Sequence, residues 1–518
     1  MRLANEVLVV LAALAALQAP CALAAADVRV EGDDLLAAQP RILLSLAAPA
    51  GAESLVVEGL QGTERISSLY AFELDLASAG GVPVAAEAVL GRELRVTIAL
   101  PNGRTRHVHG LCSRFAQSGP GRYRAEVVPS LWLLTRNARS RIFQEATVPG
   151  ILEAVLGQTP GGLAVESRLT GTFQPRDHVV QYRETDFQFA SRLMEEEGIW
   201  YFFRHDENGH TMVLGNTPQG HPDLPGFFPY VPRQLFDPPG AIQSWNKVQE
   251  IRPGKVVLWD HTFELPGQNL EATAAIQPSV AAGQVIHDLT AGGAPNLEIY
   301  DYPGEYAQRF DGVDQGGAER PAELAKVFDD AQRTAEIRMQ EQAARALVIQ
   351  GASTSPAFVP GHRFQLTRHF DGNGPYVLTG VRHAARAAQG GTAGVYSNQF
   401  ECIPAGLPYR PERVTRKPIV PGTQTAIVVG PPGQEIFTDK YGRVKVRFHW
   451  DREGRAGEET SCWVRIGALH AGQEAGLLIA PRIGTEVIVS FLEGDPDQPI
   501  VVGSVYNAQH LPPRAPAD

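Results

Sequence analysis

Four histidines are the residues whose spacing comes nearest to a reactive site. His107 and His109 stand two residues apart in an alternating segment, so both imidazoles share one face of an expected strand. Zinc can bind such a pair, but a zinc site needs three or four ligands and no third is identifiable nearby. We therefore expect an exposed polar hairpin face. His205 and His210 flank an Asn-Gly turn, and we expect both to be surface residues.

Two aspartates near the C-terminus resemble part of a calcium loop. Asp495 and Asp497 flank Pro496. Calcium needs six or more oxygen ligands, usually with a glycine and a distal bidentate glutamate. The continuation Gln498-Pro499 favours a turn that joins two strands, and this is what we expect.

The sequence lacks the common catalytic motifs. It contains no Gly-x-Ser-x-Gly elbow, no Gly-x-x-x-x-Gly-Lys phosphate loop and no His-Glu-x-x-His helix. No pair of carboxylates in a helical insertion presents itself for glycoside hydrolysis. We therefore predict that the chain is not an enzyme and has no catalytic, cofactor-binding or metal-binding residues.

Composition indicates a soluble, globular and acidic chain. Its 518 residues allow roughly three or four domain-sized units. The net charge of -11 argues against general nucleic-acid binding. The spacing of Cys21, Cys112, Cys402 and Cys462 fits no metal knuckle, so we favour buried free thiols while a disulfide between distant strands stays open.

Two C-terminal segments have strand periodicity. In 438–454, four apolar residues alternate with three polar ones: Val444, Val446, Phe448 and Trp450 with Lys445, Arg447 and His449. In 481–507, Val487, Val489 and Phe491 share one face before a turn at 494–497. Short strands closed by such turns predict a small antiparallel barrel. Because Trp450 points away from the cations, we expect no stacking surface for nucleic acid.

The rest of the chain is expected to be mainly strands with a few helices. Residues 93–111 read as a hairpin, and a short helix follows Pro149-Gly150 and ends at Gly157. A helix at 186–197 begins with a capping box of Thr185 and Gln188. A longer one covers roughly 322–347.

Two charged segments are candidate contacts with other subunits or partners. The helix at 186–197 ends in Glu195-Glu196-Glu197, where the helix dipole disfavours negative charge. We expect either a solvated, slightly unfavourable end or a contact with a basic surface of a neighbouring subunit. The proline-rich stretch 404–421 reads as a stiff linker, and it carries the basic residues Arg410, Arg413, Arg416 and Lys417.

Several motifs in order resemble one family. LVVEGLQGTERISSLYAFELDL (55–76), ETDFQFASRLMEEEGIWYFFRH (184–205), YDYPGEY (300–306), Pro360-Gly361 with Phe364, 421–430 and both C-terminal segments are similar to VgrG, the spike protein of bacterial type VI secretion systems. The resemblance covers about residues 40–508. It implies a fold related to the baseplate hub and spike of contractile phage tails.

The implied fold is mainly β with helical insertions (β + α/β): phage-hub-like barrel domains, then a small OB-fold barrel. The expected parts are a leader-like segment (1–38), the hub-like domain (39–403), the basic linker (404–421), the OB domain (422–508) and a tail (509–518). The implied assembly is a homotrimer between the Hcp tube and a spike. It would carry effector proteins and meet a membrane only during injection.

Two features at the ends of the chain depart from this pattern. VgrG proteins continue into a β-helix needle, whereas this sequence stops at Asp518, so a PAAR tip is expected only if a needle is supplied in trans. A truncated gene, a fragment and a short hub are all open. Residues 1–38 read as a secretory leader or as an upstream extension. We expect assembly in the cytoplasm and release through the type VI apparatus, with Sec export left open.

Two other functions are kept as alternatives. One is the tail hub of a phage-derived contractile particle, which has the same ancestry. The other, of a different class, is an exported binding protein or hydrolase, for which the leader-like segment is the motive.

Overall fold

The computed structural model describes residues 42–99, 105–232, 240–388, 394–453, 460–473 and 475–513. These residues belong to a compact unit that runs from Gln39 to Asp518. The predicted leader-like segment, with Cys21, and the end of the tail lie outside the described residues. No helix in the described ranges has the length and apolarity that a membrane crossing requires.

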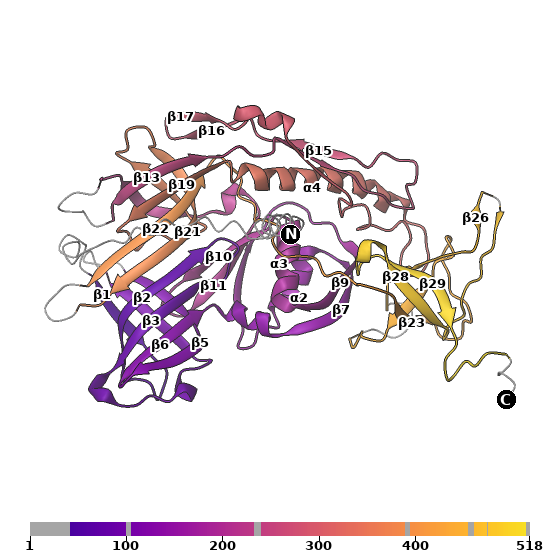
Figure 1. Cartoon of the computed structure of the whole chain (residues 1–518), viewed down its shortest axis with the longest axis horizontal. Helices are drawn as coiled ribbons and strands as arrows, with labels where there is room; N and C mark the ends of the chain where they lie inside the picture. Colours follow the sequence, from indigo (N-terminus) through magenta and orange to yellow (C-terminus); the bar gives the residue numbers. More distant parts are fainter. Residues whose placement is uncertain are drawn as a thin grey trace, which may run out of the picture. The chain divides into compact units, whose positions relative to one another are not determined.

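Eight strands form a first barrel (Figure 1). They are β1 (Leu43–Ala47), β2 (Leu55–Arg65), β3 (Ala71–Ser78), β4 (Glu93–Ala99), β5 (Thr105–Gly119), β6 (Arg122–Val128), β21 (Gly374–Arg386) and β22 (Val395–Pro404). The sheet order is β1-β4-β5-β6-β3-β2-β21-β22. An antiparallel bridge between Ile42 and Gly394 joins the start of β1 to the start of β22 and closes the ring. The antiparallel pair β4–β5 confirms the hairpin predicted at 93–111, whose tip lies outside the described residues.

A second barrel shares two of these strands. β21 and β22 continue into β19 (Leu347–Ser353) and β13 (Ile242–Gln249) on one side, and into β20 (Arg363–Thr367) and β12 (Asp223–Pro229) on the other. A bridge from Tyr230 to Ile242 links the ends of β12 and β13. Two barrels that share strands confirm the hub-like architecture that the sequence predicted.

A helical insertion lies between the strands of the two barrels. It contains β7 (Ala138–Ala146), α2 (Val148–Leu156), β8 (Ala164–Arg168), β9 (Arg176–Thr185), α3 (Asp186–Glu196), β10 (Trp200–His205) and β11 (His210–Gly215). The capping box of Thr185 and Gln188 is present at α3, as predicted. The side chain of Thr147 caps α2, which positions a helical face that is almost entirely buried.

A second insertion places a long helix against small strands. It contains β14 (Lys255–Leu258), β15 (Ala272–Ala275), β16 (Ser279–Ala282), β17 (Val285–Asp288), β18 (Glu298–Asp301) and α4 (Lys326–Ala343). The helix predicted at 322–347 is therefore present, with a 3-10 turn at Pro321–Ala325 before it. Buried alanines, including Ala331 and Ala335, allow α4 to pack closely on β14 and β15. Further 3-10 turns lie at Ala79–Gly81, Ala86–Ala88, Ser130–Arg136, Pro218–Gly220, Ala291–Asn296 and Leu492–Gly494.

The C-terminal barrel has five strands: β23 (Gln424–Val429), β24 (Lys445–Phe448), β25 (Arg465–Ile466), β28 (Glu486–Phe491) and β29 (Pro499–Val505). Their order is β24-β23-β28-β29-β25, and a bridge between Val444 and Val464 closes it. Val487 and Val489 are buried in its core, as the alternating pattern predicted. A small hairpin, β26 (Ala471–Gly472) with β27 (Ala475–Gly476), extends from this barrel.

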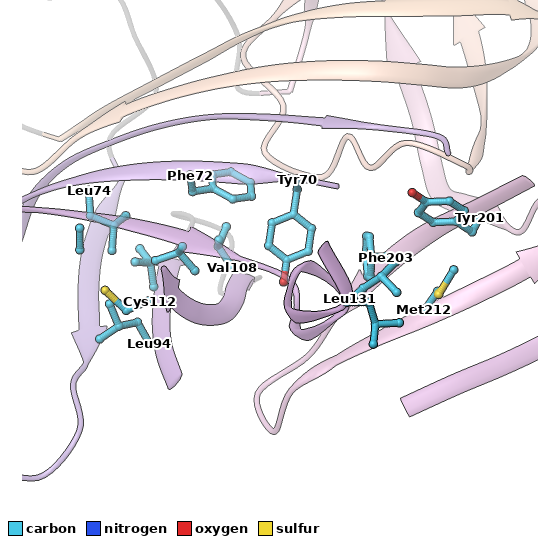
Figure 2. Packing of buried hydrophobic residues seen from close by; sticks show 14 of the residues in the cluster. Tyr70, Phe72, Leu74, Leu94, Val108, Cys112, Leu131, Tyr201, Phe203 and Met212 are labelled. Atoms are coloured by element: carbon cyan, nitrogen blue, oxygen red, sulfur yellow. The ribbon is translucent and has the colours of Figure 1, made fainter. Parts of the chain in front are cut away.

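The core of the first barrel continues into the helical insertion. Figure 2 shows Tyr70 between the barrel side chains of Phe72 and Leu74 and the side chains of Phe203 and Met212, which come from β10 and β11. The hairpin β10–β11 is therefore part of the hydrophobic core. The described cysteines, Cys112, Cys402 and Cys462, are buried free thiols, which confirms that expectation.

Candidate functional site: an ionic junction at the end of helix α3

The three glutamates that end α3 are buried. The carboxylate of Glu196 lies 2.6 Å from the guanidinium of Arg176, and that of Glu197 lies 2.5 Å from the same group. A second oxygen of Glu197 lies 2.6 Å from Arg333 of α4. The expectation of a solvated helix end is therefore wrong, because cations from β9 and α4 neutralise the carboxylates that the helix dipole disfavours.

The ion pairs keep these carboxylates charged. Burial alone raises the pKa of Glu196, but Arg176 and Arg192 outweigh it and hold this pKa far below its usual range. Arg176 and Arg333 lower the pKa of Glu197 against the same effect of burial. Buried ion pairs of this geometry contribute little net stability but are costly to break, since the remaining charge has no compensation.

Helix α4 extends the network. Asp330 lies 2.6 Å from both Arg309 and Arg333. Burial opposes ionisation of Asp330, but these two cations lower its pKa to about 2. The network therefore joins the first insertion to the second. We call it, together with the linker contacts described next, the ionic junction.

The linker lies along this junction. The backbone amide and the hydroxyl of Thr415 donate to Glu195 at 2.9 and 2.8 Å. Burial nevertheless raises the pKa of Glu195. Arg410 donates to the carbonyls of Gly198 and Asn216 at 2.9 and 2.7 Å. Arg413 lies 2.6 Å from Glu305.

The predicted contact residues are thus mostly engaged within the chain. Glu195, Glu196, Glu197, Arg410, Arg413 and Lys417 all have partners in the same chain. Arg416 is exposed and pairs with no residue of the described ranges. Contact of these residues with another subunit or partner stays a prediction, and Arg416 is the member with an accessible charge.

Lys417 joins the linker to the C-terminal barrel. Its ammonium lies 2.7 Å from Asp495 and 2.7 Å from Asp497. Burial disfavours the ammonium, but these two carboxylates raise its pKa well above the usual range. Asp497 also accepts the backbone N–H of Val180 in β9 at 2.6 Å. The expected turn is present, and its two aspartates bind a lysine.

A second set of contacts fixes the C-terminal barrel on the insertions. Arg443 makes a bidentate pair with Asp311 at 2.6 and 2.8 Å, and its guanidinium lies 5.1 Å from the ring centre of Phe263. Trp463 donates to the carbonyl of Asp314 at 2.7 Å. Lys445 hydrogen-bonds to Gln315 and lies 5.0 Å from the Trp463 ring.

The burial of Lys445 corrects the prediction for this strand. We expected Lys445 on the polar face of a half-buried strand, beside Arg447 and His449. It is completely buried, because that end of β24 faces the insertions rather than water. Arg447 is exposed, as expected.

A cavity of about 350 Å³ lies between the two sets of contacts. His178, Asp177, Phe263, Arg443 and Trp463 are among the residues that line it. Burial, and next the carboxylate of Asp311, raise the pKa of Asp177 to about 7. Burial lowers the pKa of His178 to about 4. Among the residues that line the cavity, Asp177 therefore titrates near pH 7 and His178 is neutral there.

The histidines singled out in the sequence are not where we expected them. His109 and His210 are buried and the side chain of His205 is inaccessible, because the β10–β11 hairpin packs against β5 instead of extending into water. His107 is half-buried. Across the described ranges, no three or more His, Cys, Asp or Glu residues are grouped to hold a metal ion.

Sequence reasoning missed the basic half of the junction. Arg192 stands four residues before Glu196 on α3, and this spacing was a visible signal for an ion pair. Arg176 and Arg333 lie on other elements, so nothing local to the glutamates indicated them. The ionic junction can hold the two insertions, the linker and the C-terminal barrel in a fixed relation.

Two family profiles match the chain. Residues 63–389 match the family described as phage tail baseplate hub, and residues 436–506 match the type VI secretion system/phage-baseplate injector OB domain. These ranges contain most of the two shared barrels and most of the C-terminal barrel.

Curated relatives carry the same domains. The type VI secretion system spike protein VgrG1b of Pseudomonas aeruginosa is 37% identical over 93% of this chain and 62% of its own length. VgrG1a of the same species is also 37% identical, over 92% of this chain and 71% of its own. The actin cross-linking toxin VgrG1 of Vibrio cholerae is 32% identical over 89% of this chain. The chain thus spans less than two thirds of the length of VgrG1b.

Solved structures agree on the fold. An Escherichia coli type VI secretion component, described as similar to the T4 tail proteins gp27 and gp5, matches with a TM-score of 0.58 at 21% identity over 89% of this chain and 100% of that one. The Francisella PdpA-VgrG complex matches with a TM-score of 0.56 at 8% identity, over 92% of this chain and 72% of that one. Shared barrels, a closed OB barrel and these relatives give one conclusion: the chain belongs to the VgrG family of type VI secretion spike proteins, which shares its hub with phage tail baseplates.

Proposed function

We propose that this protein is a structural hub of a type VI secretion apparatus. It acts as a homotrimeric adaptor between the Hcp tube and a spike, and effector proteins travel with it. The observation that carries the proposal is that the OB barrel is held by two sets of ion pairs: the ionic junction binds it to the linker through Lys417, and Arg443 binds it to the second insertion. A part that transmits the thrust of a tube to a spike needs this rigidity.

The proposed role is mechanical and not enzymatic. Burial of the junction charges favours a fixed geometry, because each displaced ion would remain in a low-dielectric environment. The toxin named among the relatives is much longer than this chain, which covers 41% of it. We therefore assign no toxin activity to these residues.

Exposed apolar side chains beside the C-terminal barrel support assembly with other copies. Leu469, Leu478 and Ile479 flank the β26–β27 hairpin and are 91, 63 and 68% exposed. Clusters of this kind mark association surfaces in soluble proteins. We infer that these side chains become covered in the homotrimer, which places the contact near the threefold axis of the assembly.

Protein partners are proposed from the relatives. A Francisella VgrG has been solved in a complex with PdpA, which supports docking of another protein on this fold. Hcp and effector proteins are the proposed partners. We propose assembly in the cytoplasm and release through the apparatus.

Gene deletion tests the function. Removing the gene from its own bacterium is expected to stop the release of Hcp into the medium, and the wild-type chain is expected to restore it. Unchanged Hcp release would overturn the proposal. Loss of contractile tail particles with normal Hcp release would instead support a phage-type tail hub, the alternative that the baseplate hub profile favours.

A further inference from the structure

Three buried histidines meet where the β10–β11 hairpin packs on the first barrel. The ring centres of His109 and His210 lie 5.5 Å apart, and those of His205 and His210 lie 6.3 Å apart. Tyr70 packs against both His205 and His210, and its hydroxyl donates to the carbonyl of His109 at 2.6 Å. Figure 2 shows the ring of Tyr70 between Val108 of β5 and Phe203 of β10. We call His109, His205 and His210 the histidine chain.

Backbone amides fix the proton positions in the first branch of this chain. The N–H of Ser130 donates to Nε2 of His210 at 3.0 Å, so this nitrogen carries no proton. The proton of neutral His210 is therefore on Nδ1, which donates to Nδ1 of His109 at 3.2 Å. The proton of His109 is consequently on Nε2, which lies 3.6 Å from the carboxylate of Glu93.

The second branch is fixed in the same way. The N–H of His109 donates to Nδ1 of His205 at 3.1 Å. His205 therefore has its proton on Nε2 and donates to Glu64 at 3.0 Å. Glu64 is held by Arg106 at 2.5 Å and by His383 at 2.9 Å. All three rings of the histidine chain are neutral. Both nitrogens of His205 and of His210 are hydrogen-bonded, whereas Nε2 of His109 faces Glu93 beyond hydrogen-bond distance.

No ring can accept a second proton without losing a hydrogen bond. A proton on Nε2 of His210 expels the amide of Ser130, and one on Nδ1 of His205 expels the amide of His109. A proton on Nδ1 of His109 opposes the N–H of His210. A backbone amide cannot reverse its direction, so tautomer exchange offers no escape.

Burial outweighs the carboxylates Glu93 and Glu64, which favour the protonated forms of His109 and His205 respectively. Burial is the largest cause that lowers the pKa of all three rings, and the pKa of His210 falls to about 3. The titratable and charged groups around the chain come from several elements: Glu64, Tyr70, Glu93, Arg95, Arg106, Asp206 and His383. Glu64 and Arg106 are buried charges next to the histidine chain, and they pair with each other.

We propose that the histidine chain is an acid-sensitive clamp, which holds the β10–β11 hairpin on the first barrel near neutral pH and releases it on acidification. In the opened state each histidine titrates near its ordinary value of about 6.5. Each proton gained on opening makes the opening equilibrium about tenfold more favourable per pH unit below that value. Three histidines together give an increase of up to about a thousandfold per pH unit.

Hydrogen exchange on the full-length chain tests the clamp. Exchange is measured by mass spectrometry between pH 7.5 and 5.0, with correction for the intrinsic rate, in peptides that contain the amides of Ser130 and His109. Peptides from β19 in the second barrel serve as the internal reference. Selective loss of protection at Ser130 and His109 below pH 6.5 supports the proposal. If the β19 peptides lose protection at the same pH and to the same extent, the proposal is overturned, and no variant is needed for this result.

A matched pair of variants tests whether the pH dependence of opening comes from the histidine chain. In H210Q the amide oxygen can accept from Ser130 and the amide nitrogen can donate to His109, but the side chain does not titrate. We expect the pH dependence of opening to weaken by about tenfold per pH unit, whereas H449Q, at an exposed histidine, leaves it unchanged. A folded H210Q with wild-type pH dependence overturns the proposal. If H210Q does not fold, the wild-type profile decides.

Discussion

The ammonium of Lys417 lies 2.7 Å from the carboxylate of Asp497, and the same carboxylate accepts the backbone N–H of Val180. One aspartate of a C-terminal turn therefore contacts both the linker and strand β9. The junction depends on this convergence, because Val180 stands 317 residues before Asp497 and Lys417 lies within the linker.

Removal of Lys417 is expected to loosen the C-terminal barrel. The K417M substitution keeps most of the side-chain volume but leaves Asp495 and Asp497 without their cation. We expect a loss of about 3 kcal/mol in the free energy of unfolding of this barrel. Limited proteolysis between residues 404 and 421 is expected to become faster. The control is R416M at the exposed neighbour; equal cleavage of the two variants contradicts the assignment.

Neutralising Glu197 is expected to weaken the junction at neutral pH. Its pKa is lowered in the folded protein, so it contributes stability above about pH 4.3 that is lost as the pH falls further. E197Q should therefore cost about 3 kcal/mol at pH 7 and much less near pH 2.5. Thermal melts across this range measure the difference. E336Q, at an exposed carboxylate of α4, is the control and should show neither effect.

Asp177 is predicted to change stability with pH in the opposite direction from Glu197. Its pKa is raised to about 7, so the folded chain binds this proton more tightly than the unfolded chain does. Stability is therefore lost as the pH rises from about 4 through 7. D177N should stabilise the protein by on the order of 2 kcal/mol at pH 8, with the gain vanishing near pH 4. Urea unfolding at the two pH values checks this; a gain that is independent of pH contradicts it.

Arg443 tests the second set of contacts. A lysine cannot reproduce its bidentate pair with Asp311 or its stacking on Phe263. We expect R443K to destabilise the C-terminal barrel by about 2 kcal/mol. R447K, at an exposed arginine of the same strand, is expected to behave as wild type. Equal urea midpoints for the two variants would show that Arg443 is not a structural contact.

Local sequence patterns predicted which helices, strands and turns form, but not which of these elements pack together. The capping box of Thr185, the alternation of Val487 with Val489 and the turn at Asp495 each depend on a few adjacent residues, and each is present. Closure of the first barrel depends on one bridge between Ile42 and Gly394. No local rule connects residues so far apart in the sequence.

The site was harder to predict, because its charges are compensated by residues that are far away in the sequence. Glu197 looked solvated only while Arg333 was not known to lie beside it. His210 beside an Asn-Gly turn read as exposed, since turns usually meet water. The hydrophobic residues of β10 and β11 instead bury that hairpin against β5, and the histidines become inaccessible with it.

Assembly is the central claim, and the absolute mass of the full chain in solution tests it most directly. Light scattering after size-exclusion chromatography is predicted to give three times the chain mass of 56.0 kDa. A variant with Leu469, Leu478 and Ile479 replaced by glutamate is predicted to give a folded monomer. A wild-type chain that remains a monomer at high concentration would contradict the homotrimeric hub. A wild-type trimer whose variant is still a trimer would contradict only the assigned contact.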